Sequence, residues 1–172
     1  MNQNLTKRIV VTGVIAALYA VLTLILAPIS FGPVQFRLSE IMVLLAFVDP
    51  LYILGLTLGC LLSNILGGYG IMDVVFGSLA TFMSCVVIYW TKNTIKNIKV
   101  SLLVSSIWPT IFNGLIIGWM LHITINVPML ITMLQVAFGE FIVVTVIGVP
   151  LGSLLAKKYG RYFLKLGLAK NI

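Results

Sequence analysis

The sequence predicts an all-helical integral membrane protein, a compact bundle of six transmembrane helices in a single domain over residues 1–172. Of these residues, 60% are hydrophobic and only 9% are charged, which leaves too little polar surface to coat a soluble domain of this size. The apolar residues form runs of roughly 20 residues or more, the length that crosses a bilayer. The 11 basic residues lie mostly in short clusters between these runs, as topology signals do.

The first expected helix covers residues 9–27, which carry no charge. Small residues, among them Ala16 and Ala20, recur on one face at three- and four-residue spacing. Such a face lets another backbone approach closely, either inside this protein or from a partner. Residues 28–35 contain two prolines, a glycine and a serine, so a short loop is expected after this helix.

The next apolar run, residues 38–66, is too long for one span and is interrupted by Asp49 and Pro50. Aspartate favours the position before a helix, and proline favours the first helical position. The sequence therefore predicts a tight hairpin between one helix at residues 36–48 and another at residues 50–66.

Three further helices are expected, at residues 72–91, 100–122 and 128–157. A lysine- and asparagine-rich connector separates the first two, and a turn near His122 and Pro128 separates the last two. Pairs of glycines four residues apart favour close packing of three helices. These pairs are Gly55 and Gly59, Gly114 and Gly118, and Gly148 and Gly152.

The basic residues predict the orientation, because they collect on the cytoplasmic side of a membrane protein. Six spans with both chain ends in the cytoplasm place every basic residue except Arg37 on that side, including the five of the C-terminal tail. A single helix over residues 38–66 would instead split the basic clusters across the membrane. The hairpin interpretation is therefore preferred.

Polar side chains are rare in this chain, and their positions predict a binding site. A charged side chain at a helix centre costs roughly 3 kcal/mol on insertion scales and is kept for pairing or function. Arg37 and Glu40 share one helix face, so they form either an interfacial salt bridge or part of a ligand site. The six candidate residues on the outer side are Arg37, Glu40, Asn64, Asp73, Asn113 and Glu140. Three acids against one arginine suit a cationic ligand or one rich in N–H donors.

Several motifs are absent from the sequence. It contains no phosphate-binding G-x-x-x-x-G-K-[ST] loop, so ATP hydrolysis would require partner subunits. His122 is the single histidine, and Cys60 and Cys85 form no metal-binding or redox motif. We expect both cysteines to be small core residues. No enzyme activity, metal, cofactor or nucleic-acid binding is expected.

Several segments together resemble the QueT family, S components of energy-coupling-factor (ECF) transporters. The segments are Phe36-Arg37-Leu38-Ser39-Glu40, Ala46-Phe47-Val48-Asp49-Pro50, Ser63-Asn64-Ile65-Leu66-Gly67-Gly68, Asp73 and Phe138-Gly139-Glu140. The resemblance implies a substrate-binding subunit in a bacterial cytoplasmic membrane, joined to a transmembrane coupling protein and two cytoplasmic ATPase subunits. It also implies that an alanine-x-x-x-alanine surface contacts the coupling protein, and Ala16 and Ala20 match that spacing.

The substrate implied by the resemblance is a queuosine precursor, an aminomethyl-deazaguanine base. Its cationic group and its adjacent N–H donors agree with an acidic site. Glu140 or Glu40 would accept the N–H edge, Asp73 would meet the ammonium, and Asn64 and Asn113 would satisfy the remaining groups. The alternatives are an S component for another vitamin-like molecule, a proton-coupled carrier acting alone, and an intramembrane enzyme or structural subunit.

Overall fold

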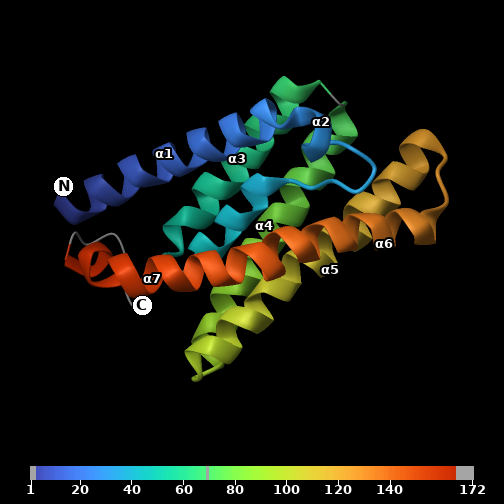
Figure 1. Ribbon diagram of the computed structural model, residues 1–172. Helices are drawn as coiled ribbons and strands as arrows, with labels where there is room; N and C mark the ends of the chain where they lie inside the picture. The colour runs from blue at the N-terminus through green and yellow to red at the C-terminus, as the bar shows by residue number, and fades with distance from the viewer. Residues whose placement is uncertain (1–2, 69, 166–172) are drawn as a thin grey trace.

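The computed structural model describes residues 3–68 and 70–165, and every regular element among them is helical (Figure 1). Lys170 of the basic tail lies outside the described residues. The elements are α1 (Gln3–Ile25), α2 (Ala27–Ser30), η1 (Leu38–Phe47), α3 (Leu51–Gly67), α4 (Ile71–Thr94), α5 (Ile98–Ile125), α6 (Met129–Glu140), η2 (Phe141–Gly148) and α7 (Val149–Lys165). α6, η2 and α7 follow one another without a break, so the predicted last helix is one long helical segment.

Within residues 3–68 and 70–165, four helical stretches are long and apolar enough to cross a membrane. They are Leu5–Ile25, Ile71–Thr94, Ile98–Ile125 and Met129–Leu155, and two shorter apolar helices, η1 and α3, accompany them. The expected helix at residues 36–48 is a 3-10 helix, η1. A 3-10 helix rises about 2.0 Å per residue against 1.5 Å in an α-helix, so its ten residues cover roughly 20 Å of depth.

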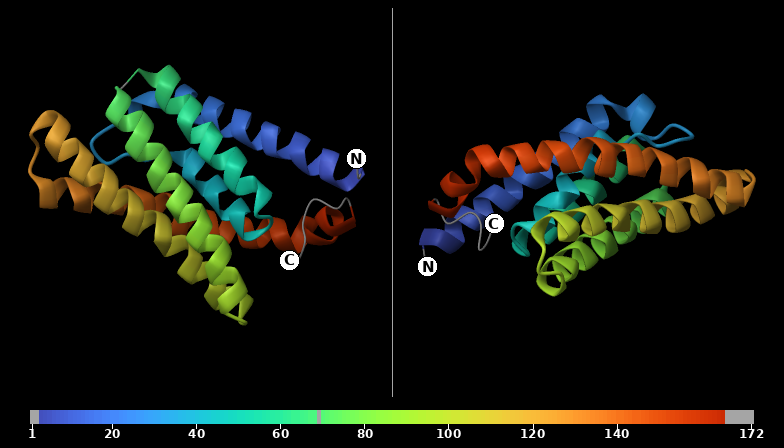
Figure 2. Two further views of the ribbon diagram at one scale, coloured as in Figure 1. Left: turned by 180° about the vertical axis from the view of Figure 1, so that it is seen from behind. Right: turned by 60° about the horizontal axis from the view of Figure 1, so that its bottom comes forward.

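The connections of the bundle gather at two opposite ends. At one end lie the start of α1, the η1–α3 hairpin and the α4–α5 connection, and we call this the Arg8 end (Figures 1 and 2). At the other end, the loop end, lie the segment between α2 and η1 and the α3–α4 and α5–α6 connections. This alternation of ends is what a chain that crosses a membrane repeatedly requires.

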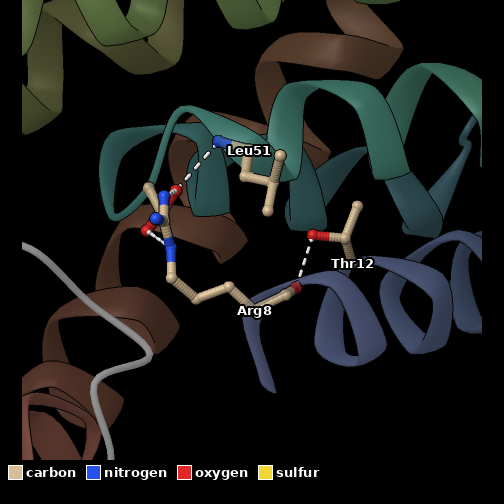
Figure 3. A network of polar contacts seen from close by, with 4 residues as sticks. Arg8, Thr12 and Leu51 are labelled. Atoms are coloured by element: carbon tan, nitrogen blue, oxygen red, sulfur yellow. Dashed lines mark hydrogen bonds and ion pairs between the residues drawn. The ribbon is translucent and has the colours of Figure 1, made fainter. Parts of the chain in front are cut away.

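An ion pair joins α1 to the hairpin at the Arg8 end (Figure 3). Arg8 Nε and Nη2 donate to the two carboxylate oxygens of Asp49 over 2.8 and 2.5 Å. The backbone N–H of Leu51 donates to Asp49 Oδ1 over 2.9 Å, but Pro50, and not Asp49 as predicted, occupies the position directly before α3, which begins at Leu51. Asp49 is fully buried. The first helix and the hairpin are thereby fixed to each other on the same side of the bundle.

Glycines set the close approach of two helix pairs. A Cβ on Gly55 would lie 2.5 Å from the carbonyl oxygen of Thr12, so α1 and α3 pack backbone to backbone. A Cβ on Gly118 would lie 2.6 Å from Met133 Cα, which gives α5 and α6 the same kind of contact. The predicted third pair differs, because nothing lies within 4 Å of a Cβ on Gly152.

The 3-10 helix η1 is the centre of the bundle. It contacts α1, α3, α4, α5 and η2, and its Val43 and Ala46 side chains are fully buried in the apolar core. Large apolar side chains on the outer faces of the long helices are exposed, as at Leu18 of α1 and Leu134 of α6. A soluble protein rarely carries such a continuous apolar surface, and a lipid environment accounts for it.

Candidate functional site

All six predicted site residues are buried, although none is apolar. Arg37, Glu40, Asn64, Asp73, Asn113 and Glu140 are each less than 5% exposed. Arg37 directly precedes η1, Glu40 belongs to η1, and the others come one each from α3, α4, α5 and α6. Polar side chains from four α-helices, from η1 and from the residue before it are therefore held inside the bundle.

Cys60 of α3 lies at the centre of several of these side chains. Its sulfur accepts hydrogen bonds from Arg37 Nη1 at 3.7 Å and Asn64 Nδ2 at 3.5 Å, and it lies 3.3 Å from Thr81 Oγ1. Asn64 Nδ2 also donates to the backbone carbonyl of Asp73 over 3.0 Å. The contacts join the end of α3 to the start of α4 and place Arg37, Asn64 and Asp73 in one cluster.

Glu40 joins the same cluster through hydroxyl groups. Tyr19 of α1 and Thr81 of α4 both donate to Glu40 Oε1, the second over 3.2 Å. The predicted salt bridge between Arg37 and Glu40 does not form within 4.0 Å in the described part of the chain. The guanidinium instead lies over the ring of Phe31, 5.0 Å from its centroid. Of the two alternatives for this pair, the salt bridge is therefore not formed in the described structure.

Glu140 and Asn113 complete the set in different ways. The charge of the Glu140 carboxylate interacts with those of Glu40 and Arg37, but no hydrogen bond or ion pair joins Glu140 to them in the described structure. Asn113 is buried on α5, which packs against α4 and α6. No polar contact joins Asn113 to the other five candidates among the described residues.

Every one of the six residues has a buried polar atom without a hydrogen-bond partner in the described structure. The atoms are Arg37 Nε and Nη2, Glu40 Oε2, Asn64 Oδ1, Asp73 Oδ2, Asn113 Nδ2 and Glu140 Oε2. An unsatisfied buried donor or acceptor costs about 1–3 kcal/mol, more when it is charged, and native proteins leave few of them. Buried donors and acceptors without hydrogen-bond partners are thus concentrated at the six candidate residues.

The candidate partner surface of α1 is turned inward. Ala16 and Ala20 are 8% and 6% exposed, and a Cβ on Gly59 of α3 would lie 2.7 Å from the carbonyl oxygen of Ala16. Packing inside this protein, one of the two alternatives drawn from the sequence, therefore accounts for these alanines. The small residues on the exposed face of α1 are Gly13 and Ala17.

A hollow of about 350 Å³ lies between Phe31, Pro33, Leu121, Pro128 and Gln135, among others. None of the six candidates lines this hollow or a second one on the outer face of α6. The hollow nevertheless reaches Phe31, whose ring the Arg37 guanidinium covers.

Sequence reasoning missed three residues of the cluster, Tyr19, Cys60 and Thr81. All three are fully buried. Tyr19 carries the one phenol of an otherwise uncharged run, which is a weak signal, and Cys60 was expected to be an ordinary core residue. Within residues 3–68 and 70–165, no three His, Cys, Asp or Glu side chains gather as metal ligands.

Comparisons with known proteins agree with the resemblance seen in the sequence. The profile described as QueT transporter matches residues 9–157. A curated relative, the Queuosine precursor transporter QueT of Lactococcus lactis subsp. cremoris (strain MG1363), is 41% identical over 85 residues, which are 48% of this chain and 50% of the relative. The alignment thus spans half the length of that relative. No solved structure matches the chain. Because the family profile covers most of the sequence, the chain belongs to the QueT transporter family.

Proposed function

We propose that this chain is the membrane-embedded substrate-binding subunit of an ATP-driven ECF importer and that it captures a queuosine precursor, an aminomethyl-deazaguanine base. The observation that carries the proposal is the buried cluster of free donors and acceptors in a member of a transporter family. The relative from Lactococcus lactis is named for transport of a queuosine precursor.

The groups of the cluster match the groups of this base. Glu40, Asp73 and Glu140 supply acceptors for an ammonium and for N–H donors. The free nitrogens of Arg37 and Asn113 supply donors for the ring carbonyl. Three carboxylates against one guanidinium favour a cation over an anion. Carboxylate acceptors of this kind also disfavour a ligand that lacks N–H groups, because their desolvation would then stay uncompensated.

The proposed topology has six spans, with both chain ends in the cytoplasm and the cluster nearer the outside. The grouping of the connections at two ends and the ion pair of Arg8 with Asp49 support it. The hollow beside Phe31 then lies on the outer side, where substrate would arrive. Plasma-membrane location follows from this function.

The ATP-driven part of the proposal requires a transmembrane coupling protein and two cytoplasmic ATPase subunits. The sequence has no phosphate-binding loop of its own. Ala16 and Ala20 were expected to meet the coupling protein, and their packing against α3 makes the exposed Gly13 and Ala17 the better candidates on α1.

Direct binding tests the proposal. We expect the purified chain, without ATP, to bind the aminomethyl-deazaguanine base in calorimetric titrations, and guanine, thiamine and riboflavin to compete poorly. Tighter binding of another vitamin than of the base would refute the substrate and favour an S component for that vitamin.

A second candidate, a proton-coupled carrier acting alone, is favoured by one observation. Glu40 and Glu140 are buried within reach of each other, and neither forms an ion pair in the described structure. Buried carboxylates of this kind also serve as proton sites. Uptake of the base by liposomes that contain only this chain and carry a proton gradient would establish the carrier. Uptake that requires the ATPases would establish the S component.

A further inference from the structure

One carboxylate oxygen of Glu40 accepts hydrogen bonds, and the other has no hydrogen-bond partner in the described structure. The hydroxyl groups of Tyr19 and Thr81 both donate to Oε1, and all three side chains are fully buried. Oε2 has no hydrogen-bond partner in the described structure. The hydroxyl groups from α1 and α4 fix the orientation of the Glu40 carboxylate, which belongs to η1. Glu40 is therefore preorganised to offer a single oxygen, which suits one N–H group of a ligand.

Glu140 is arranged differently. Its side chain is 3% exposed, its buried Oε2 has no hydrogen-bond partner, and no hydrogen bond to Oε1 is found among the described residues. Both oxygens are thus available together. Two adjacent, coplanar N–H donors bind a carboxylate through a pair of parallel hydrogen bonds, and only a carboxylate with two free oxygens can accept them.

Electrostatics separates Glu140 from the other two acids. The main charge interaction of both Glu40 and Asp73 is attraction to the opposite charge of Arg37, so part of the charge of each is already compensated. The strongest charge interaction of Glu140 is repulsion from Glu40, with attraction from Arg37 second. A ligand that brings positive charge and N–H donors stabilises the cluster most where these two like charges approach each other.

We propose that Tyr19 and Thr81 are positioning residues that hold Glu40 to receive the aminomethyl ammonium, while Glu140 accepts the two-donor edge of the base. The assignment rests on the proposed function and deepens it by giving each glutamate a separate part of the ligand. It moves the ammonium from Asp73, its expected partner, to Glu40.

Three probes separate the two contacts in calorimetric titrations of the full chain. The first is the aminomethyl base. The second carries a nitrile in place of the aminomethyl group, so the ammonium is lost. The third lacks the exocyclic amine, so the two-donor edge is lost. We expect Tyr19→Phe and Thr81→Val each to lower the affinity of the chain for the aminomethyl base about tenfold, as for the loss of one hydrogen bond to a charged group. In competition titrations, the same two substitutions should lower the affinity for the nitrile base much less.

The rescue and control variants test whether the effect passes through Glu40. Thr81→Ser keeps the hydroxyl and should bind as the original chain does. In a Glu40→Gln background, Thr81→Val should have little further effect, because coupled residues are not additive. Thr57→Val is the matched control, since the Thr57 hydroxyl donates only to Ile53 O of its own helix. Glu140→Gln should instead remove the preference for the base that keeps its exocyclic amine.

The results distinguish this inference from the proposed function. If the original chain binds none of the three bases, the proposed function is wrong. If the original chain binds the aminomethyl base, but Tyr19→Phe and Thr81→Val lower the affinities for that base and for the nitrile base equally, the positioning role is wrong. The proposed function then stands. Loss of the ammonium preference in the two hydroxyl variants, with Thr81→Ser normal, supports the inference. Either single variant suffices if the other does not fold.

Discussion

Removing the arginine of the Arg8–Asp49 ion pair should destabilise the bundle measurably. Exposed ion pairs contribute about 0.2–1 kcal/mol, whereas removal of one partner from a fully buried pair costs about 3–5 kcal/mol. The Arg8 side chain is 16% exposed and Asp49 is not exposed at all, so this pair lies between the two cases. Asp49 also keeps its hydrogen bond from Leu51. We expect Arg8→Met to cost about 2 kcal/mol, a value between the two ranges.

Thermal unfolding in detergent measures this loss. At about 2–4 °C per kcal/mol for a chain of this size, Arg8→Met should lower the midpoint by about 4–8 °C. Lys7→Met removes the same charge from an exposed neighbour and should shift the midpoint little. Adding Asp49→Asn to Arg8→Met should restore part of the loss, because no buried charge then stays unpaired. Equal midpoints for the Arg8 and Lys7 variants would refute the reasoning.

Two further predictions concern the site and the orientation. Gly77→Ala should weaken binding of the aminomethyl base about tenfold. Its Cβ would lie 2.5 Å from Asn64 Nδ2 and displace an amide that donates to Cys60 Sγ and to the backbone carbonyl of Asp73. Gly13→Ala, with nothing within 4 Å of its Cβ, should bind the base normally, and equal affinities of the two variants would contradict the prediction. A cysteine at the exposed Lys96 should react with a membrane-impermeant maleimide only from the cytoplasmic side, and one at Asn126 only from outside, while labelling of both from one side would overturn the six-span topology.

Much of the helical arrangement is readable from the sequence, because a bilayer restricts the choices. Long uncharged runs have to be helical, and Asp49 with Pro50 marks a break that the structure places between Phe47 and Leu51. The winding of η1 and η2 was not foreseen. The same apolar sequence is compatible with a 3-10 helix, a π-helix and an α-helix. Only packing against neighbouring helices selects among these three windings.

The candidate site was predictable where a polar residue is conspicuous in an apolar run, as at Glu40 and Glu140. Their supporting contacts were not predictable, since Tyr19 and Thr81 lie 21 and 41 residues from Glu40. The same limit applies to Arg8, which looked like a topology signal and is also a structural partner of Asp49. Sequence spacing indicates which residues share a helix face, but it does not identify the helix that covers this face.

The small-residue face of α1 illustrates this limit. The spacing of Ala16 and Ala20 predicts close approach of another backbone, and the structure supplies that backbone from α3 through Gly59. An Ala16→Trp substitution, which would otherwise be expected to block assembly alone, would overpack this contact. Overpacking costs about 1–3 kcal/mol, so a loss of assembly in this variant would not identify a partner surface.

The central claim is that the buried acidic cluster binds the ligand, and one calorimetric comparison tests it most directly. The chain carrying both Glu40→Gln and Glu140→Gln is titrated with the aminomethyl base beside the original chain and beside Asp49→Asn, which removes a buried carboxylate at the Arg8 end. We predict that the original chain and Asp49→Asn bind the base and that the doubly substituted chain binds at least about a hundredfold more weakly. Equal affinity of all three chains would contradict the account.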